Sequence, residues 1–415
     1  MKTVPKDRKL DQSINVLREG YRFLPKRFAK LDTDIFETRL LGEKVICLTG
    51  EEGAKLFYDK EKFQRKGALP KRIEKSLFGE NAIQGMDGDP HEHRKLLFMS
   101  LMTPEKMAKL GRLTSEQWRK QAEGWKNQKN IVLLEEAKIV LCQAACQWAG
   151  VPLKEGEVKK RANLLWAMVD AFGAVGSRHR KGRKARVNAE KWIKELIENI
   201  REGKVAAEEG SAIYEMAFHR DLEGNHLSTQ VAAEELLNVI RPTVAVAAYV
   251  AFGALALHDH VEEREKVKEA QGDYIERFAQ EIRRLFPFVP FLGARVRKDF
   301  MWDGYSFEKD TLVLIDVHGI DHDRRLWERP NQFSPERFKD WKGGLFDFIP
   351  QGGGEHYTGH RCPGEWITME AIKSSLEFLT REIEYEVPSQ DLSYSLSRMP
   401  SFPKSGFRIQ EVEFK

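Results

Sequence analysis

The sequence of 415 residues contains few cysteines, little net charge and no long hydrophobic run. Its four cysteines are scattered and do not form the framework of a disulfide-rich secreted protein, so we expect a reducing, cytoplasmic location. The 68 Lys and Arg residues nearly balance 64 Asp and Glu residues, and the net charge of +4 indicates no nucleic-acid partner. The longest apolar run, residues 244–257, falls short of the roughly 18 residues that suggest a membrane span, and it therefore predicts a buried helix without stable membrane insertion.

The composition, with 41% hydrophobic and 32% charged residues, is typical of a folded globular chain and excludes collagen, coiled coil and general disorder. No segment near the N-terminus combines the basic, apolar and small-residue regions of a secretory signal. Because no internal repeat, low-complexity segment or linker divides the sequence, we expect residues 1–415 to form a single domain.

Hydrophobic periodicity predicts a mainly α protein with small sheets. β-branched and aromatic residues at 34–48 predict a strand pair around Gly42, and residues 296–317 predict a hairpin that turns at Asp303 and Gly304. Residues 228–258 form one helical pattern that would span roughly 45 Å. Apolar residues three and four apart predict further helices at 51–58, 104–125, 131–148, 159–172, 188–200, 273–286 and 365–382.

One cysteine stands in an unusual setting. Residues 352–364 form a glycine-rich loop that delivers Cys362 to the start of the last predicted helix. Backbone N–H groups and the helix dipole at such a position stabilise a thiolate. By itself this signal is weak, because a free cysteine is more often an inert buried side chain.

Two further segments strengthen the signal. Glu281 and Arg284 stand one turn apart on a predicted helix, and Arg337 precedes the cysteine loop. A Glu–Arg pair at this spacing is commonly a solvated salt bridge. In this order, however, the three segments resemble the cytochrome P-450 superfamily. The resemblance implies that fold, a buried structural network of Glu281, Arg284 and Arg337, and Cys362 as the proximal thiolate ligand of haem b.

The resemblance extends along the chain and is closest to the bacterial fatty-acid peroxygenase branch of that superfamily. Arg241 and Pro242 belong to this pattern, and His360 and Arg361 before the cysteine depart from the wider superfamily signature. The matching segments are residues 63–65, 68–72, 75–79, 81–88, 168–173 and 350–354.

Arg241 and Pro242 occupy the place where a conventional member carries an acid followed by Thr for proton delivery. Pro242 lacks an N–H and is expected to kink the long helix, a disruption of about 3 kcal/mol in an ordinary helix interior. Arg241 lies in an apolar helix and needs a counter-ion. An internal acid such as Glu234, Glu235 or Asp170, or a side chain that reaches solvent, would satisfy it. The resemblance instead implies a substrate carboxylate.

The resemblance implies hydrogen-peroxide-dependent hydroxylation of medium- to long-chain fatty acids at the alpha and beta carbons, with no redox partner. The bound carboxylate would act as general acid–base in place of a protein acid. Gln84 matches the hydroxylating side of the branch, where a His is associated with decarboxylation, and some terminal alkene is expected. Two alternatives stay open, namely a reductase-dependent fatty-acid monooxygenase and a non-catalytic protein that binds haem or fatty acid.

The resemblance also suggests which residues line the substrate tunnel and which contact the haem propionates. Each apolar residue could equally belong to the plain core. The expected lining is Leu77, Phe78, Val169, Phe172, Ala245 and Phe288, and the expected propionate contacts are Arg65, His91 and Lys95.

Three other features favour ordinary structural roles. Cys142 and Cys146 share a helix face without further metal ligands nearby, and His318 and His322 lack the Glu of a metalloprotease motif. The basic stretch at residues 178–186 has no interleaved aromatics, so we expect a solvated loop and helix start rather than a nucleic-acid site.

Overall fold

The computed structural model describes residues 2–7, 10–126, 128–269 and 273–415. The prediction of a mostly helical protein with small sheets is confirmed. Helices occur at most of the predicted positions, and each buries the apolar face that predicted it. These helices are α3 (Gly50–Phe57), α6 (Pro104–Glu123), α7 (Leu133–Ala149), α8 (Val158–Asp170), α14 (Asp273–Leu285) and α16 (Glu365–Glu377), the last continuing as a π-helical turn, η6 (Phe378–Glu382).

Both predicted hairpins are present. Leu41 and Gly42, with φ of 53° and 78°, form the turn of the first hairpin, and Asp303 and Gly304 form that of the second. The first belongs to a five-stranded sheet with the order β1 (Ile35–Leu40), β2 (Glu43–Leu48), β8 (Leu312–Ile315), β5 (Leu292–Val296) and β3 (Phe63–Gln64). The other sheets are β6 (Phe300–Trp302) with β7 (Tyr305–Phe307), and β4 (Ile131–Val132), β10 (Arg408–Phe414) and β9 (Ile383–Glu386).

The long apolar helix is interrupted beyond its proline. Helix α11 (Thr229–Ala245) continues through Pro242, and α12 (Ala247–Asp259) begins after a turn at Val246. The helix therefore continues through Pro242, and the interruption lies four residues later, at Val246. Residues 229–259 are long and apolar enough to cross a membrane, yet 94% of their most apolar window is buried inside the protein. This burial agrees with the prediction of a core helix.

The basic stretch at residues 178–186 does not form the expected loop. It lies inside α9 (Gly176–Arg201), which begins 12 residues before the predicted start at residue 188. Lys and Arg are good helix formers, and Gly182, Ala185 and Ala189 give this half of the helix a narrow buried face. Because Arg186 shares that face, one charge of the stretch is buried rather than solvated.

Several short elements were not predicted, because their sequences are polar and their apolar residues acquire a pattern only by packing. Among them, α2 buries Phe23, Leu24 and Phe28 against the five-stranded sheet. The unpredicted helices include α1 (Ser13–Glu19), α2 (Phe23–Leu31), α5 (Gly88–Ser100), α10 (Ala212–Phe218), α13 (Val261–Glu269) and α15 (Val317–Ile320). Short turns of helix are α4 (Lys71–Ile73), the π-type η2 (Glu74–Phe78), and the 3-10 turns η1 (Gly20–Arg22), η3 (Ile83–Gly85), η4 (Glu155–Glu157) and η5 (Pro335–Phe338).

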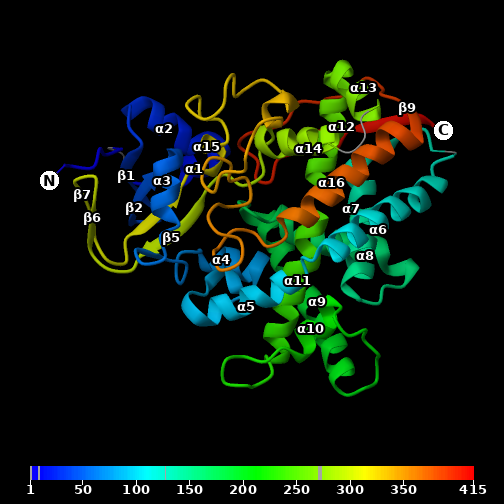
Figure 1. Ribbon diagram of the computed structural model, residues 1–415, viewed down its shortest axis with the longest axis horizontal. Coiled ribbons are helices and arrows are strands. Elements are labelled where there is room, and N and C mark those ends of the chain that lie inside the picture. Colours follow the sequence, from blue (N-terminus) through cyan, green and yellow to red (C-terminus); the bar gives the residue numbers. More distant parts are fainter. Residues whose placement is uncertain (1, 8–9, 127, 270–272) are drawn as a thin grey trace.

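The largest hydrophobic cluster lies among the long helices. Helix α11 packs against α7, α8 and α9 and also reaches η2 and α16. Figure 1 shows α11 near the centre of the molecule, with β1, β2 and α3 toward the N-terminal side and α6 and α16 on the other. The arrangement brings the middle of α11 and the start of α16 into the interior, and both predicted site segments lie there.

Candidate active site

Cys362 lies in the loop that leads into α16. Gly352 and Gly354 adopt φ of 95° and 82°, which only glycine takes easily, and this lets the loop fold back on itself. The Gln351 side-chain amide points to the Cys362 sulfur, with Nε2 and Sγ 3.8 Å apart. Burial raises the pKa of the Cys362 thiol, while the charge of Lys95 and the Gly364 N–H oppose that effect.

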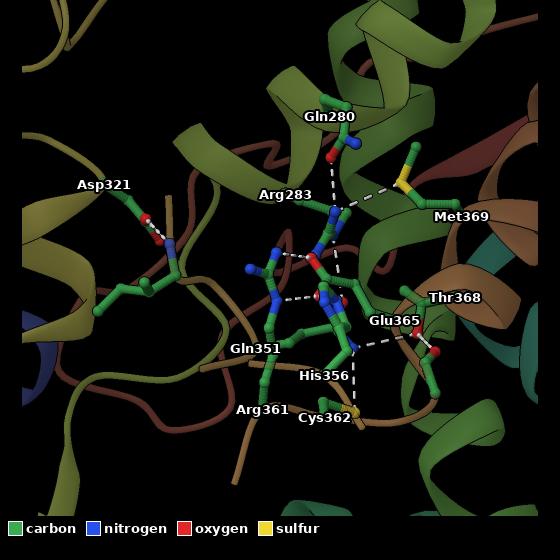
Figure 2. Close-up of polar contacts among 12 residues, drawn as sticks. Gln280, Arg283, Asp321, Gln351, His356, Arg361, Cys362, Glu365, Thr368 and Met369 are labelled. Atoms are coloured by element: carbon green, nitrogen blue, oxygen red, sulfur yellow. Dashed lines mark hydrogen bonds and ion pairs between the residues drawn. The ribbon is translucent and has the colours of Figure 1, made fainter. Parts of the chain in front are cut away.

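A buried charge network fixes the amide that faces this sulfur (Figure 2). Glu365 accepts hydrogen bonds from Arg283 and from Arg361, whose Nε lies 2.7 Å away, and contacts His356 at 3.1 Å. Burial opposes ionisation of Glu365, but the charges of Arg283 and Arg361 hold its pKa well below the usual range. Arg283 Nε also donates to Gln351 Oε1 at 3.1 Å, so the amide nitrogen of Gln351 is left to face Cys362.

The structure brings together Glu281, Arg284 and Arg337. The Arg284 guanidinium donates to both carboxylate oxygens of Glu281, at 2.7 and 2.8 Å, and Arg337 Nε donates at 3.2 Å. The Glu281 side chain is fully buried, and the Ser334 N–H supplies a fourth hydrogen bond to it. These contacts tie α14 to η5 and the segment before the cysteine loop.

Arg241 presents a buried cation from the middle of α11. Its residue is 5% exposed, its Nη2 donates to Asn238 Oδ1 at 3.1 Å, and its Nε has no hydrogen-bond partner. The guanidinium carbon lies 5.4 Å from the centre of the Phe78 ring. Burial, and then the charge of Arg186, lower the pKa of Arg241 to about 9, whereas Cys362 acts in the opposite sense. Cys362 and Arg241 therefore interact electrostatically.

Within the described chain, the acids that might have neutralised Arg241 are engaged elsewhere. Glu234 accepts from the Asn81 N–H at 3.0 Å. Glu235 accepts from the Ile83 N–H and from Arg94, and Asp170 pairs with Arg398 and lies near Arg178. None of the three acids that the sequence offered as an internal counter-ion is paired with Arg241.

Gln84 is linked to Arg241 through Asn238. The Asn238 amide nitrogen donates to Phe78 O at 2.9 Å and lies 3.4 Å from Gln84 Oε1 and 3.3 Å from Glu235 Oε2. Because these acceptors fix the nitrogen side of the amide, its oxygen faces Arg241. Burial raises the pKa of Glu235 to about 7, against the charge of Arg94.

Comparison with known proteins decides the family. Residues 158–407 match the family model described as cytochrome P-450. The chain belongs to the cytochrome P-450 family. Cytochrome P450EX alpha (CYP152N1) with myristic acid is 45% identical in sequence, with a TM-score of 0.97 over 100% of both chains. Cytochrome P450SP alpha (CYP152B1) in complex with (R)-ibuprophen is 44% identical, with a TM-score of 0.95 over 97% of this chain and 99% of that chain.

A third structure, a variant of cytochrome P-450 OleT in complex with arachidonic acid, is 37% identical, with a TM-score of 0.97 over 100% of this chain and 99% of that one. The resemblance to the fatty-acid peroxygenase branch is therefore confirmed.

The residues of this P-450 fit a haem bound through a cysteine thiolate. Cys362 stands at a helix start with an amide donor at its sulfur, and Arg241 lies near it on α11. Lys95 and Arg65 are buried cations on the same side of the molecule as the cysteine loop: Lys95 donates to the Arg361 carbonyl, and Arg65 stacks 4.2 Å from the Phe57 ring centre. Their contact with the propionates stays a prediction.

His91 lies in the same region, and its contact with a propionate also stays a prediction. The His91 ring is buried and contacts the His360 ring in a tilted arrangement, with centres 4.0 Å apart, and burial lowers the pKa of His91 to about 3. Arg361, next to the cysteine, is occupied by Glu365, which agrees with the departure from the superfamily signature.

The six expected tunnel residues share one hydrophobic cluster. Phe78 approaches Arg241, and Phe288 stacks on Tyr249 with ring centres 4.4 Å apart. The cluster contains Leu77, Phe78, Val169, Phe172, Ala245 and Phe288. Their contact with substrate stays a prediction.

The other singled-out residues are structural in character. Cys142 and Cys146 are fully buried in α7, and the rings of His318 and His322 are in tilted contact with centres 4.2 Å apart. Over the described part of the chain, no group of three or more His, Cys, Asp or Glu residues is placed to hold a metal ion.

Sequence reasoning missed Asn238, Gln351 and Arg186. Only Asn238 carries a sequence signal, because it stands three residues before Arg241 and therefore on the same helix face. Gln351 and Arg186 carry no such signal, because the residues that they contact belong to other parts of the chain.

Proposed function

We propose that this P-450 hydroxylates medium- to long-chain fatty acids at the alpha and beta carbons with hydrogen peroxide, and that Arg241 binds the substrate carboxylate. The observation that carries the proposal is the buried Arg241, which has one neutral protein partner, an orphaned Nε and no acid paired with it in the described chain. A buried guanidinium of this kind requires an anion. The neighbours solved with myristic and arachidonic acid support a fatty acid as that anion.

Haem bound through Cys362 supplies the oxidising chemistry. Arg241 holds the carboxylate by charge-assisted hydrogen bonds and so fixes the head of the chain. Only the first carbons beyond the carboxylate then lie near the reacting centre, which limits hydroxylation to the alpha and beta positions through positioning. Apolar contacts contribute about 0.8 kcal/mol per buried methylene, which favours long chains.

The protein offers little proton-transfer machinery of its own beside Arg241. Pro242 follows directly, and the Thr243 hydroxyl donates to Val239 O at 3.2 Å within the helix. Glu235 is separated from the guanidinium by the Asn238 amide, which does not titrate. The bound carboxylate is therefore the group that takes a proton from hydrogen peroxide and returns it to the departing oxygen.

Gln84 supports hydroxylation over decarboxylation. Its amide lies beside Asn238 and carries no titratable proton, unlike an imidazole. We expect hydroxy acids as the main products and terminal alkene as a minor one. We further propose that the whole chain is one cytoplasmic haem-thiolate domain that needs no redox partner.

The test uses purified haem-loaded protein, a saturated fatty acid and hydrogen peroxide, without any electron donor. Formation of 2- and 3-hydroxy acids, identified by mass spectrometry, is the expected result. Product only with a reductase and NADPH would instead identify a conventional monooxygenase. Binding without turnover, with peroxide only bleaching the haem, would identify a non-catalytic binding protein.

A further inference from the structure

Arg186 is a second buried arginine near Arg241, from a different helix. It belongs to the basic stretch that the sequence predicted to be solvated, yet it is 2% exposed. Its Nη1 donates to Leu77 O at 2.8 Å, its Nε donates to Glu190 one turn further along α9, and its Nη2 is buried without a partner. Because burial of a cation is costly, we ask which contacts and which charges Arg186 acts on inside the protein.

The hydrogen bond to Leu77 acts on the wall beside Arg241. Leu77 and Phe78 end the η2 turn, so their carbonyl groups lack helical partners. Arg186 from α9 binds the first carbonyl and Asn238 from α11 binds the second, at 2.8 and 2.9 Å. The segment is thereby held between two helices, and the Phe78 ring is held over the Arg241 guanidinium.

The charge of Arg186 acts on Arg241 directly. After burial itself, Arg186 is the leading cause of the lowered pKa of Arg241. Among the described residues, the ion pair between Arg186 and Glu190 is the only one that either arginine makes. The two buried cations thus have one paired acid between them, because Glu190 contacts Arg186 and no acid is paired with Arg241 in the described chain. Glu190 is itself partly exposed and screened by water. The region keeps an excess of positive charge.

We propose that Arg186 is a positioning and specificity-determining residue for a carboxylate ligand. It holds the Leu77–Phe78 wall over Arg241, and its charge strengthens the preference for an anionic head group over a neutral one of the same chain length. This inference rests on the proposed fatty-acid function. Arg186 acts through Leu77 and Arg241 and through its field, not by touching the reacting atoms.

The test compares a saturated fatty acid with the primary alcohol of the same length, each titrated into haem-loaded protein by the shift of the haem absorption band. Arg186→Met is expected to weaken acid binding at least tenfold and alcohol binding less than threefold. Arg186→Lys keeps the charge and is expected to retain the acid preference within threefold, while the alpha-to-beta product ratio changes because the wall is no longer held. Arg183→Met, on the exposed face of the same helix, serves as the matched control and should resemble the parent.

Glu190→Gln provides a test of opposite sign, which also serves if the Met variant does not fold. Loss of the acid leaves Arg186 less neutralised, and the acid-over-alcohol preference should rise two- to threefold. An unchanged preference in both Arg186→Met and Glu190→Gln would overturn the proposal, as would equal weakening of acid and alcohol in Arg186→Met. If Arg241→Leu abolishes the preference for acid over alcohol but Arg186→Met and Glu190→Gln leave that preference unchanged, the proposed role of Arg186 is wrong and the proposed function stands. If the parent itself shows no acid preference, the proposed function fails.

Discussion

Replacement of Arg241 by Leu separates substrate binding from protein stability. Arg241 makes one side-chain hydrogen bond, to the neutral Asn238, and is 5% exposed, so a bound carboxylate would form little-screened bonds with it. Two charge-assisted hydrogen bonds contribute about 1.5–3 kcal/mol each. Their loss should lower kcat/KM with peroxide and a long fatty acid by about 10²- to 10⁴-fold.

The same substitution should stabilise the substrate-free protein. Removal of a buried cation without an acid partner relieves its desolvation, and replacement of buried ion pairs by apolar residues is known to stabilise by about 1–4 kcal/mol. The assay therefore pairs steady-state kinetics with the unfolding midpoint measured in the absence of fatty acid. Arg241→Lys, which keeps a charge without the two-point geometry, should fall between the parent and Arg241→Leu in activity.

A rescue experiment isolates the role of the carboxylate itself. A short carboxylic acid added to the parent should enable peroxide-driven oxidation of a substrate that has no acid group, and should do so poorly in Arg241→Leu. If Arg241→Leu kept kcat/KM for fatty acid within threefold of the parent, the carboxylate would be anchored elsewhere and the reasoning would be refuted.

Four further outcomes are expected. Gln351→Leu removes the amide donor at the thiolate sulfur, and redox titration should show the haem midpoint potential falling by on the order of 30–40 mV. Gln84→His should raise the alkene share of the products, as measured by gas chromatography. Glu281→Gln breaks a fully buried ion pair and should cost about 3–5 kcal/mol in the free energy of unfolding. Burial raises the pKa of Glu235 from 4.5 to about 7, so the native state retains a proton that the unfolded chain releases, and stability should fall as pH rises from about 4.5 to 7. This slope should be smaller in Glu235→Gln.

Local sequence pattern was sufficient for the elements whose signals lie within a few residues. Helix α6 begins where Thr103 caps it, with its hydroxyl 3.4 Å from the Lys106 N–H, and the hairpin turns follow from Gly42 and Gly304. Helix α2 was missed because Phe23 and its neighbours form an apolar face only against the sheet. The basic half of α9 was expected to be a loop because it is rich in charge, but most of its charges are solvated on the outer face of a helix. Its one buried arginine, Arg186, could not be predicted because it donates to a carbonyl in another segment.

The site shows the same division. Cys362 and Arg241 could be singled out because each stands in a distinctive run of sequence. The residues that orient their surroundings could not, because their partners are distant along the chain: Arg283 and Gln351 are 68 residues apart, and Arg186 and Leu77 are 109 apart. A periodic pattern carries no information about pairs at such separations.

Arg241 has no paired acid on its own helix because the neighbouring acids contact other groups. Glu234 and Glu235 stand within two turns of Arg241 on α11, yet each is bound to a backbone N–H of the segment that carries Gln84, at 3.0 and 2.9 Å. These bonds hold that segment against the helix and at the same time keep both carboxylates away from the guanidinium. If Glu234 or Glu235 were not bound to these N–H groups, it could pair with Arg241, as the sequence alone allowed. The contacts that position Gln84 are therefore also the contacts that leave Arg241 without a paired acid on its own helix.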